Sequence, residues 1–194
     1  MRKRKGKVML LTLLIIILFT SIIVAQNQKK VKVIQKTLLS DTINVPADSL
    51  WVILRAFDKV AHWTSELEHS EGVGQAKFEG ATCNKRVCLQ DGKKLVEELT
   101  MFSDEKRELA YELREGAPGF VKLAKNHWRV IEISPNQSKV QMDVTIHLSK
   151  FMGFFLGGII TKTMTKKVGI VLDELKIYAE TGEVSEAKKR QLNH

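Results

Sequence analysis

Proline and glycine are scarce in this chain of 194 residues, which contains three prolines and 12 glycines. Collagen-like and low-complexity proteins are rich in both residues, so these classes are excluded. Hydrophobic residues make up 44% of the chain, which is too many for a disordered protein. The length is that of one domain. We therefore expect one globular domain with its own hydrophobic core.

The sequence also lacks the short motifs that mark common catalytic sites. Gly-x-Ser-x-Gly, His-Glu-x-x-His, Cys-x-x-Cys and a phosphate-binding loop are absent, and the five histidines have no metal-ligand spacing. The Gly72-Val73-Gly74 segment lacks the remaining glycine of a dinucleotide-binding fingerprint. A serine hydrolase, a metal enzyme and a nicotinamide oxidoreductase are therefore excluded, and we expect no cofactor and no metal.

The excess of positive charge is confined to the N-terminal end of the chain. The net charge is +9, and nine Lys and Arg residues precede Thr37 without any Asp or Glu among them. The rest of the chain carries equal numbers of basic and acidic residues. Because a protein that neutralises phosphates carries its positive field on the folded body, nucleic acid is excluded as a partner.

Residues 8–25 form a hydrophobic run that only three polar residues interrupt. The basic segment 1–7 precedes it, a bias that holds the N-terminus in the cytoplasm and directs the rest of the chain across the membrane. We favour an uncleaved signal-anchor, with a linker at 26–30 after it, over a cleaved signal peptide or a buried core helix. We therefore expect an extracytoplasmic domain that is anchored to the membrane, or secreted or periplasmic if the signal is cleaved.

The two cysteines of an exported domain would enter an oxidising compartment. Cys83 and Cys88 lie five residues apart in what the pattern predicts as one strand, so their side chains point to opposite faces, about 16 Å apart. A disulfide cannot span that distance, although a hairpin turn at Asn84-Lys85 would bring the thiols together. We favour two free structural thiols.

Hydrophobic periodicity predicts the secondary structure after the linker. Alternating apolar residues predict a strand at 30–39. Helical spacing then predicts a short helix at 49–57, with Asp48 as its N-cap. A second short helix, carrying Trp63, is predicted at 60–67.

Alternating segments then recur between short polar turns, which is typical of antiparallel hairpins. A long helix comes next at 151–179, with Gly182 where a helix end favours glycine. The domain is expected to span 31–180, and 181–194 to form a frayed polar tail. The predicted strands are 68–78, 80–89, 94–102, 108–114, 122–133 and 139–148.

An antiparallel sheet and one long helix bury their apolar faces together when the sheet curves around the helix. The fold class is therefore α+β, with a curved antiparallel sheet wrapped around a long C-terminal helix and an N-terminal hydrophobic helix before it. A sheet that holds a helix without closing on itself leaves a cavity lined mainly by hydrophobic side chains.

Several short motifs occur in a consistent order from the first helix onward. They are Val45-Pro46-Ala47-Asp48 before Leu50-Trp51, then Trp63, Gly80-Ala81-Thr82 with Arg86, Asp91-Gly92, Glu97 and Tyr111. Their order and spacing resemble the helix-grip fold of the START-related, pollen-allergen-like (SRPBCC) superfamily. Within it, the polyketide cyclase/dehydrase-like group is the most similar. The resemblance covers about residues 34–179.

This resemblance implies a pocket for an apolar or amphipathic small molecule, such as a lipid, isoprenoid, sterol or polyketide. It does not imply one chemistry, because a few members are enzymes and many relatives bind or carry without catalysis. The expected partner is therefore a hydrophobic small-molecule ligand.

Strand parity places one carboxylate among apolar neighbours. Glu97 shares a strand face with Leu99 and Met101, so it is expected to point into the interior, where it needs a partner or a proton. Arg86 lies in the preceding strand, across a tight turn, where cross-strand contact is possible. We favour an Arg–Glu pair that stabilises the hairpin; the alternative is a pair that orients the polar end of a ligand.

Other strands supply further candidates. Tyr111 lies on the apolar face of its strand, where core packing is the favoured role. Met142 and Val144 face inward on the last strand and form either pocket wall or plain core. The candidate ligand-binding residues are Arg86, Glu97, Leu99, Met101, Tyr111, Trp128, Met142 and Val144, and no catalytic residue is assigned.

The start of the long helix is apolar on every side, and no acidic residue occurs between positions 144 and 172. Such a segment can contact an anionic bilayer and open the pocket towards it; the alternative is a helix that is buried on both sides. Segment 116–120 is a candidate rim of the pocket. The candidate membrane-contact residues are Phe151, Phe154, Phe155 and Lys162.

Three functions remain open. The first is binding, or transport, of an apolar ligand in the cavity of a membrane-associated domain. The second is a cyclase/dehydratase-type enzyme that uses Glu97 or Tyr111 as an acid–base group in an apolar pocket. The third is an interaction module whose pocket is filled by its own side chains and whose exposed Phe151–Ile160 segment docks to a partner.

Overall fold

The computed structural model describes residues 31–193, so the expected anchor at 8–25 and the linker at 26–30 lie outside the described residues. A 3₁₀ helix, η1, accompanies the α-helices and strands. In chain order the elements are β1 (Val31–Leu39), α2 (Ala47–Arg55), η1 (Phe57–His62), β2 (His69–Val73), β3 (Lys85–Gln90), β4 (Lys93–Ser103), β5 (Glu108–Glu115), β6 (Val121–Ser134), β7 (Gln137–Ser149), α3 (Lys150–Thr181) and α4 (Glu186–Leu192).

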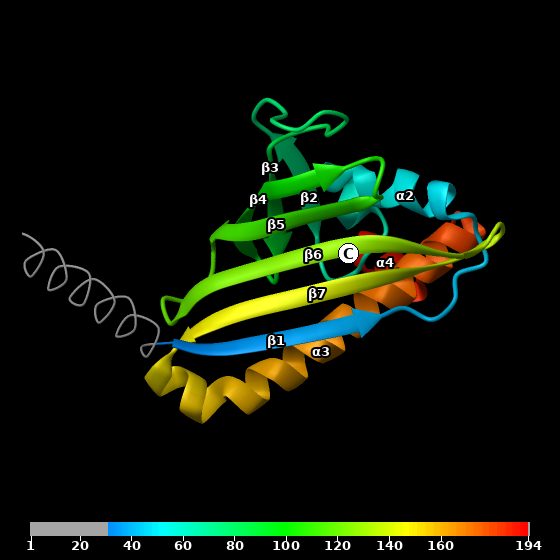
Figure 1. Cartoon of the computed structure of the whole chain (residues 1–194). Coiled ribbons are helices and arrows are strands. Elements are labelled where there is room, and N and C mark those ends of the chain that lie inside the picture. Colours follow the sequence, from blue (N-terminus) through cyan, green and yellow to red (C-terminus); the bar gives the residue numbers. More distant parts are fainter. Residues whose placement is uncertain (1–30, 194) are drawn as a thin grey trace, which may run out of the picture.

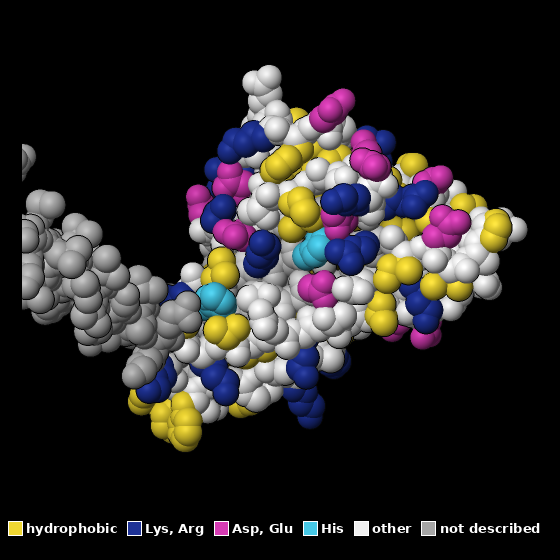
Figure 2. Space-filling model, viewed as in Figure 1, with side chains coloured by type: hydrophobic (Ala, Val, Ile, Leu, Met, Phe, Trp, Pro, Cys, Tyr) yellow, Lys and Arg dark blue, Asp and Glu magenta, His cyan; other side chains and the backbone are white. Residues whose placement is uncertain are grey.

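The seven strands form one antiparallel sheet in the order β1-β7-β6-β5-β4-β3-β2, and the sheet curves around α3 (Figure 1). Side chains of α2, η1, the sheet and the C-terminal half of α3 form one hydrophobic core. Basic and acidic side chains are interspersed over the face of the molecule in Figure 2. The predicted α+β architecture with a long C-terminal helix is therefore confirmed.

No helix within residues 31–193 combines the length and the hydrophobicity that a membrane crossing requires.

The first helix begins earlier than predicted, and Asp48 is not its N-cap. Pro46 occupies the N-cap position, so Asp48 lies within the first turn of α2, where its carboxylate accepts a hydrogen bond from Arg107 Nε at 2.6 Å. The second predicted helix at 60–67 is instead η1, which ends before Trp63.

The predicted strand at 80–89 is shorter because the chain turns before it. Gly80 has a φ of +80°, and β3 begins only at Lys85. Cys83 therefore precedes the strand that carries Cys88, and the parity argument for the two cysteines was wrong. Both thiols are nevertheless buried and free, as expected.

The C-terminal tail was predicted to be frayed, but this prediction was wrong, because the tail forms the helix α4. Ser185 caps α4 by accepting a hydrogen bond from the backbone N–H of Lys188. Lys188 is only 1% exposed, and its ammonium group donates to the carbonyl oxygen of Leu67 at 2.9 Å. A polar segment therefore packs against the domain through one lysine, whose aliphatic stem is buried and whose ammonium group is hydrogen-bonded.

A buried carboxylate fixes the C-terminal half of α3 against its neighbours. Glu174 is 4% exposed and accepts hydrogen bonds from the hydroxyl of Thr64 at 2.8 Å, the backbone N–H of Ser65 at 2.7 Å and the hydroxyl of Ser185 at 2.6 Å. These partners come from the segment after η1 and from the N-cap of α4. Three donors satisfy the carboxylate, so it holds three segments together.

The N-terminal half of α3 is held differently, by a close approach to β1. Gly153 is buried against Lys32, and a β-carbon at position 153 would lie closer than 3.0 Å to Cβ and Cγ of that lysine. Only glycine permits this contact without a shift of the helix or the strand.

Gly153→Ala should therefore destabilise the fold, because the added methyl group forces α3 away from β1. We expect the free energy of unfolding to fall by about 1 kcal/mol, as overpacking outweighs the better helix propensity of alanine. Chemical denaturation of the full chain measures this change. The matched control is Gly158→Ala, where a β-carbon meets nothing within 4 Å and a gain of about 0.5–1 kcal/mol is expected. Equal stabilisation by both substitutions would contradict the close approach.

Candidate functional site

A cavity of about 530 Å³ lies between the N-terminal half of α3 and the sheet. Its size is within the range of small-molecule sites, about 300–1,000 Å³. Most of its lining is aliphatic, and α3 contributes Ile159, Ile160, Met164 and Val168. The sheet contributes Leu95, Leu113, Ala124, Met142, Val144 and Ile146.

The cavity exists because the two halves of α3 lie differently against the sheet. Val168, Leu172 and Leu175 of the C-terminal half belong to the hydrophobic core and are at most 7% exposed. Ile160 and Met164, one to two turns earlier, line the cavity and remain partly exposed. The helix is therefore packed tightly over its C-terminal half, and the cavity lies beside the residues around Ile160 and Met164.

Two of the candidate ligand-binding residues lie at this cavity. Met142 and Val144 of β7 line it, as strand parity indicated. The loop between β5 and β6 also lines it, through Gly116, Ala117, Pro118 and Phe120, which is the position expected of a rim.

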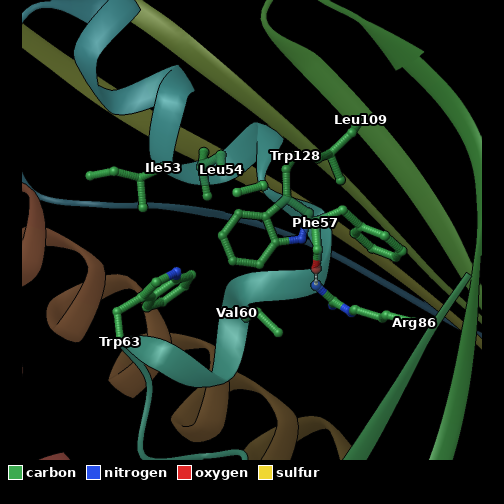
Figure 3. A pocket seen from close by; sticks show the side chains of 9 residues that line it. Ile53, Leu54, Phe57, Val60, Trp63, Arg86, Leu109 and Trp128 are labelled. Carbon is green, nitrogen blue, oxygen red and sulfur yellow. Dashed lines mark hydrogen bonds between the residues drawn. The ribbon is translucent and has the colours of Figure 1, made fainter. Parts of the chain in front are cut away.

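Arg86 and Glu97 form the predicted cross-strand pair, but not at the large cavity. They are register partners in β3 and β4, and Arg86 Nε donates to a Glu97 carboxylate oxygen at 2.6 Å. A second nitrogen of the guanidinium donates to the backbone carbonyl of Phe57 at 2.8 Å (Figure 3). Arg86 is 5% exposed, so both contacts are made in the interior.

Aromatic rings enclose the same guanidinium. Its central carbon lies 4.1 Å from the ring centre of Phe57 and 4.6 Å from that of Tyr111. Burial would lower the pKa of Arg86, but the adjacent Glu97 carboxylate outweighs this effect and raises it above the ordinary value. Arg86 is therefore a permanent buried cation with partners on every side.

Burial is the main cause of the pKa shifts of Tyr111 and Cys88, which lie beside Arg86 and Glu97. Desolvation, with the Glu97 carboxylate as a smaller cause, raises the pKa of Tyr111 above its ordinary value. Desolvation also raises the pKa of the Cys88 thiol to about 11. Both groups are therefore protonated at neutral pH, and neither is a ready base or nucleophile.

Arg86 and Trp128 do adjoin a second cavity, but its volume is only about 20 Å³ (Figure 3). Phe57, Val60 and Trp63 close it from the side of α2 and η1. This space is far too small for an organic ligand. Arg86, Glu97, Leu99, Tyr111 and Trp128 thus belong to the packed part of the domain rather than to the large cavity.

Met101 was placed on the wrong face of its strand. A register shift between Leu99 and Met101 inserts an extra residue into β4, so the alternation of side chains reverses there. Phe102 therefore enters the core, where its ring lies 5.5 Å from that of Trp51. Met101 is partly exposed and lines neither cavity.

The candidate membrane-contact residues are exposed, and the alternative of a helix buried on both sides was wrong for this segment. Phe151, Phe154 and Phe155 are 71%, 82% and 62% exposed. Lys162, two turns further along α3, is exposed as well. The cavity-lining face of the same helix, at Ile160 and Met164, was missed because every side of the segment is apolar in sequence.

Comparisons with known proteins agree with this geometry. The family described as polyketide cyclase/dehydrase and lipid transport matches residues 35–180. No curated protein sequence matches the chain.

Solved structures share the fold at low sequence identity. A truncated norcoclaurine synthase from Thalictrum flavum is 15% identical with a TM-score of 0.59, and the match covers 79% of this chain and 96% of that one. An aromatase/cyclase from a Streptomyces species is 15% identical with a TM-score of 0.55, with coverages of 80% and 99%. A START superfamily protein from Mycobacterium smegmatis is 12% identical with a TM-score of 0.51, with coverages of 74% and 98%.

Replacement of Arg86 tests whether the Arg86–Glu97 pair is structural. Arg86→Met leaves a buried carboxylate unpaired, so the free energy of unfolding should fall by about 3 kcal/mol or more. The double variant Arg86→Met with Glu97→Leu removes both charges and should be less destabilised than the single one. Chemical denaturation of the three proteins measures both effects.

The small molecules that co-purify with the double variant provide the second readout. If the pair is structural, the folded double variant retains as much ligand as the unsubstituted chain. A stable double variant that has lost its ligand would instead assign the pair to ligand binding.

Proposed function

Because the chain belongs to the polyketide cyclase/dehydrase and lipid transport family, we propose that it binds an apolar or amphipathic small molecule between α3 and the sheet. The family supports either hydrophobic-ligand binding or cyclase activity. Hydrophobic-ligand binding is favoured by one observation, the cavity of about 530 Å³ with its mainly aliphatic lining. Burial of about 300 Å² of apolar ligand surface there supplies roughly 7 kcal/mol before the costs of association.

The polar groups of the cavity suit an amphipathic ligand. A lining that is otherwise apolar is interrupted by five polar side chains, those of Gln90, Lys125, Asn126, Thr163 and Lys167. A few polar side chains in an apolar pocket orient a ligand without supplying chemistry. A lipid, an isoprenoid or a polyketide has this combination of a long apolar part and few polar groups.

Cyclase/dehydratase chemistry at Glu97 and Tyr111 is the less supported function. Neither side chain lines the large cavity, and Arg86 already holds the Glu97 carboxylate. A general acid or base must reach the reacting group within hydrogen-bond distance or through one water. An interaction module with a filled core is less supported still, because the cavity is large.

We also propose that residues 8–25 anchor the chain in a membrane, with the domain on the extracytoplasmic side. The support is the uncharged apolar run with basic residues before it. A ligand-binding domain tethered in this way lies close to a source of apolar molecules.

A substitution that fills the cavity tests the binding proposal. Ala124 of β6 lines the cavity, so Ala124→Phe places a ring inside it. We expect the amount of small molecule that co-purifies per mole of folded chain, measured by extraction and mass spectrometry, to fall about tenfold, equivalent to ~1.4 kcal/mol.

Thr145→Phe is the matched control, because Thr145 lies in β7 beside Val144 and does not line the cavity. It adds the same ring to the same sheet and should retain the ligand. The comparison cancels lipid that is carried by residues 8–25. Equal ligand content in both variants, or no ligand in the unsubstituted chain, would contradict the binding proposal.

A further inference from the structure

The start of α3 presents a continuous aromatic surface. We define the aromatic face as Phe151, Phe154, Phe155 and Ile159, which are between 62% and 82% exposed. The ring centres of Phe151 and Phe155 lie 4.9 Å apart, and those of Phe154 and Phe155 lie 5.1 Å apart. In Figure 2, hydrophobic side chains gather at the lower left, where Figure 1 places the start of α3. A clustered apolar patch of this kind marks an interaction surface.

The surroundings of the aromatic face are basic. Neither β1 nor α3 up to Leu172 contains Asp or Glu. The lysines of these two segments are Lys32 and Lys36 in β1 and Lys150, Lys162, Lys166 and Lys167 in α3, and all but Lys167 are exposed. Lys167 pairs with Glu66 at 2.7 Å, so the other five supply the positive field. Aromatic side chains beside lysines suit an interface with anionic lipid headgroups.

The topology places the aromatic face where the chain enters the fold. Val31, the first described residue, is the register partner of Ser149, which directly precedes α3. The hydrophobic run ends at residue 25, and the linker 26–30 extends over at most about 20 Å. An anchor in the bilayer therefore holds the start of α3 close to the membrane surface.

The aromatic face also adjoins the ligand cavity. Ile159 belongs to the face and lines the cavity, and Ile160 beside it lines the cavity as well. Phe120, from the loop between β5 and β6, lies on the same lining. The described structure thus places one wall of the cavity next to the surface that is both apolar and basic.

We propose that the aromatic face inserts into an anionic bilayer and turns the opening of the cavity towards the lipid. Phe151, Phe154 and Phe155 enter the boundary between headgroups and acyl chains, and the flanking lysines contact the lipid phosphates. This arrangement lets an apolar ligand pass between the bilayer and the cavity without crossing water, an inference that rests on the proposed binding function. A second copy of the chain is a poorer occupant, because a symmetric contact brings lysines against lysines.

Tryptophan fluorescence in lipid vesicles tests this docking. The three native tryptophans, Trp51, Trp63 and Trp128, are at most 5% exposed and give a constant background. Phe154→Trp places a reporter at the most exposed position of the aromatic face. The full chain is reconstituted into phosphatidylglycerol-containing vesicles, with or without bromine atoms on the acyl chains. We expect the added emission to shift to shorter wavelength and to fall about twofold with brominated lipid, because the face lies within reach of the acyl chains.

Ile133→Trp is the matched control, since Ile133 is 51% exposed and lies at the opposite end of the sheet, in β6 near the turn to β7. Its emission should be unaffected by bromine. Purely zwitterionic vesicles should reduce the quenching of Phe154→Trp, because the lysines then lose their partners. Thermal unfolding checks that both variants are folded. If Phe154→Trp does not fold, Phe155→Trp serves as a second reporter.

Three results would overturn the docking. Absence of quenching at Phe154→Trp excludes insertion. Equal quenching at Phe154→Trp and Ile133→Trp excludes a preferred face. A blue-shifted emission without quenching shows that protein covers the aromatic face, either residues 8–25 or a second copy of the chain. The ligand content of the cavity is measured separately by extraction, so failure of the docking and failure of the binding proposal are distinguishable.

Discussion

The two halves of α3 pack unequally, and this difference determines where the domain is filled and where it is hollow. Its C-terminal half is fixed by Val168, Leu172 and Leu175 in the core and by the three hydrogen bonds to Glu174. In its N-terminal half, Gly153 lies against β1, and Ile160 and Met164 line the cavity of about 530 Å³. Interiors are normally close-packed, so a space of this size beside a helix that is fixed at its other end favours a binding site over poor packing.

The domain is therefore divided into a packed part and an open part. The packed part contains Arg86, which Glu97, the carbonyl of Phe57 and two aromatic rings surround, and this cluster keeps β3 and β4 in register beneath η1. The open part has few polar side chains and no described carboxylate in its lining.

Much of the fold could be predicted from sequence periodicity, because alternation and helical spacing report directly which side is buried. β1, β4 to β7 and α3 lie close to their predicted ranges, and the resemblance to the SRPBCC superfamily is confirmed. Errors arose where a local irregularity reverses the pattern, as at the bulge that exposes Met101 and buries Phe102. They also arose where polar residues are buried, as with Lys188 in α4, since composition alone predicts exposure for such a segment.

Photo-crosslinking with an apolar probe tests whether the cavity beside α3 is a binding site, because it reports where an apolar molecule lies. The full chain is incubated with a fatty acid that carries a diazirine on its acyl chain, irradiated and digested, and the labelled peptides are identified by mass spectrometry. We expect label on peptides from both sides of the cavity, at the lining residues Val144, Ile160 and Met164. Label that is confined to Phe151–Phe155, or that is absent from the described residues, would contradict it.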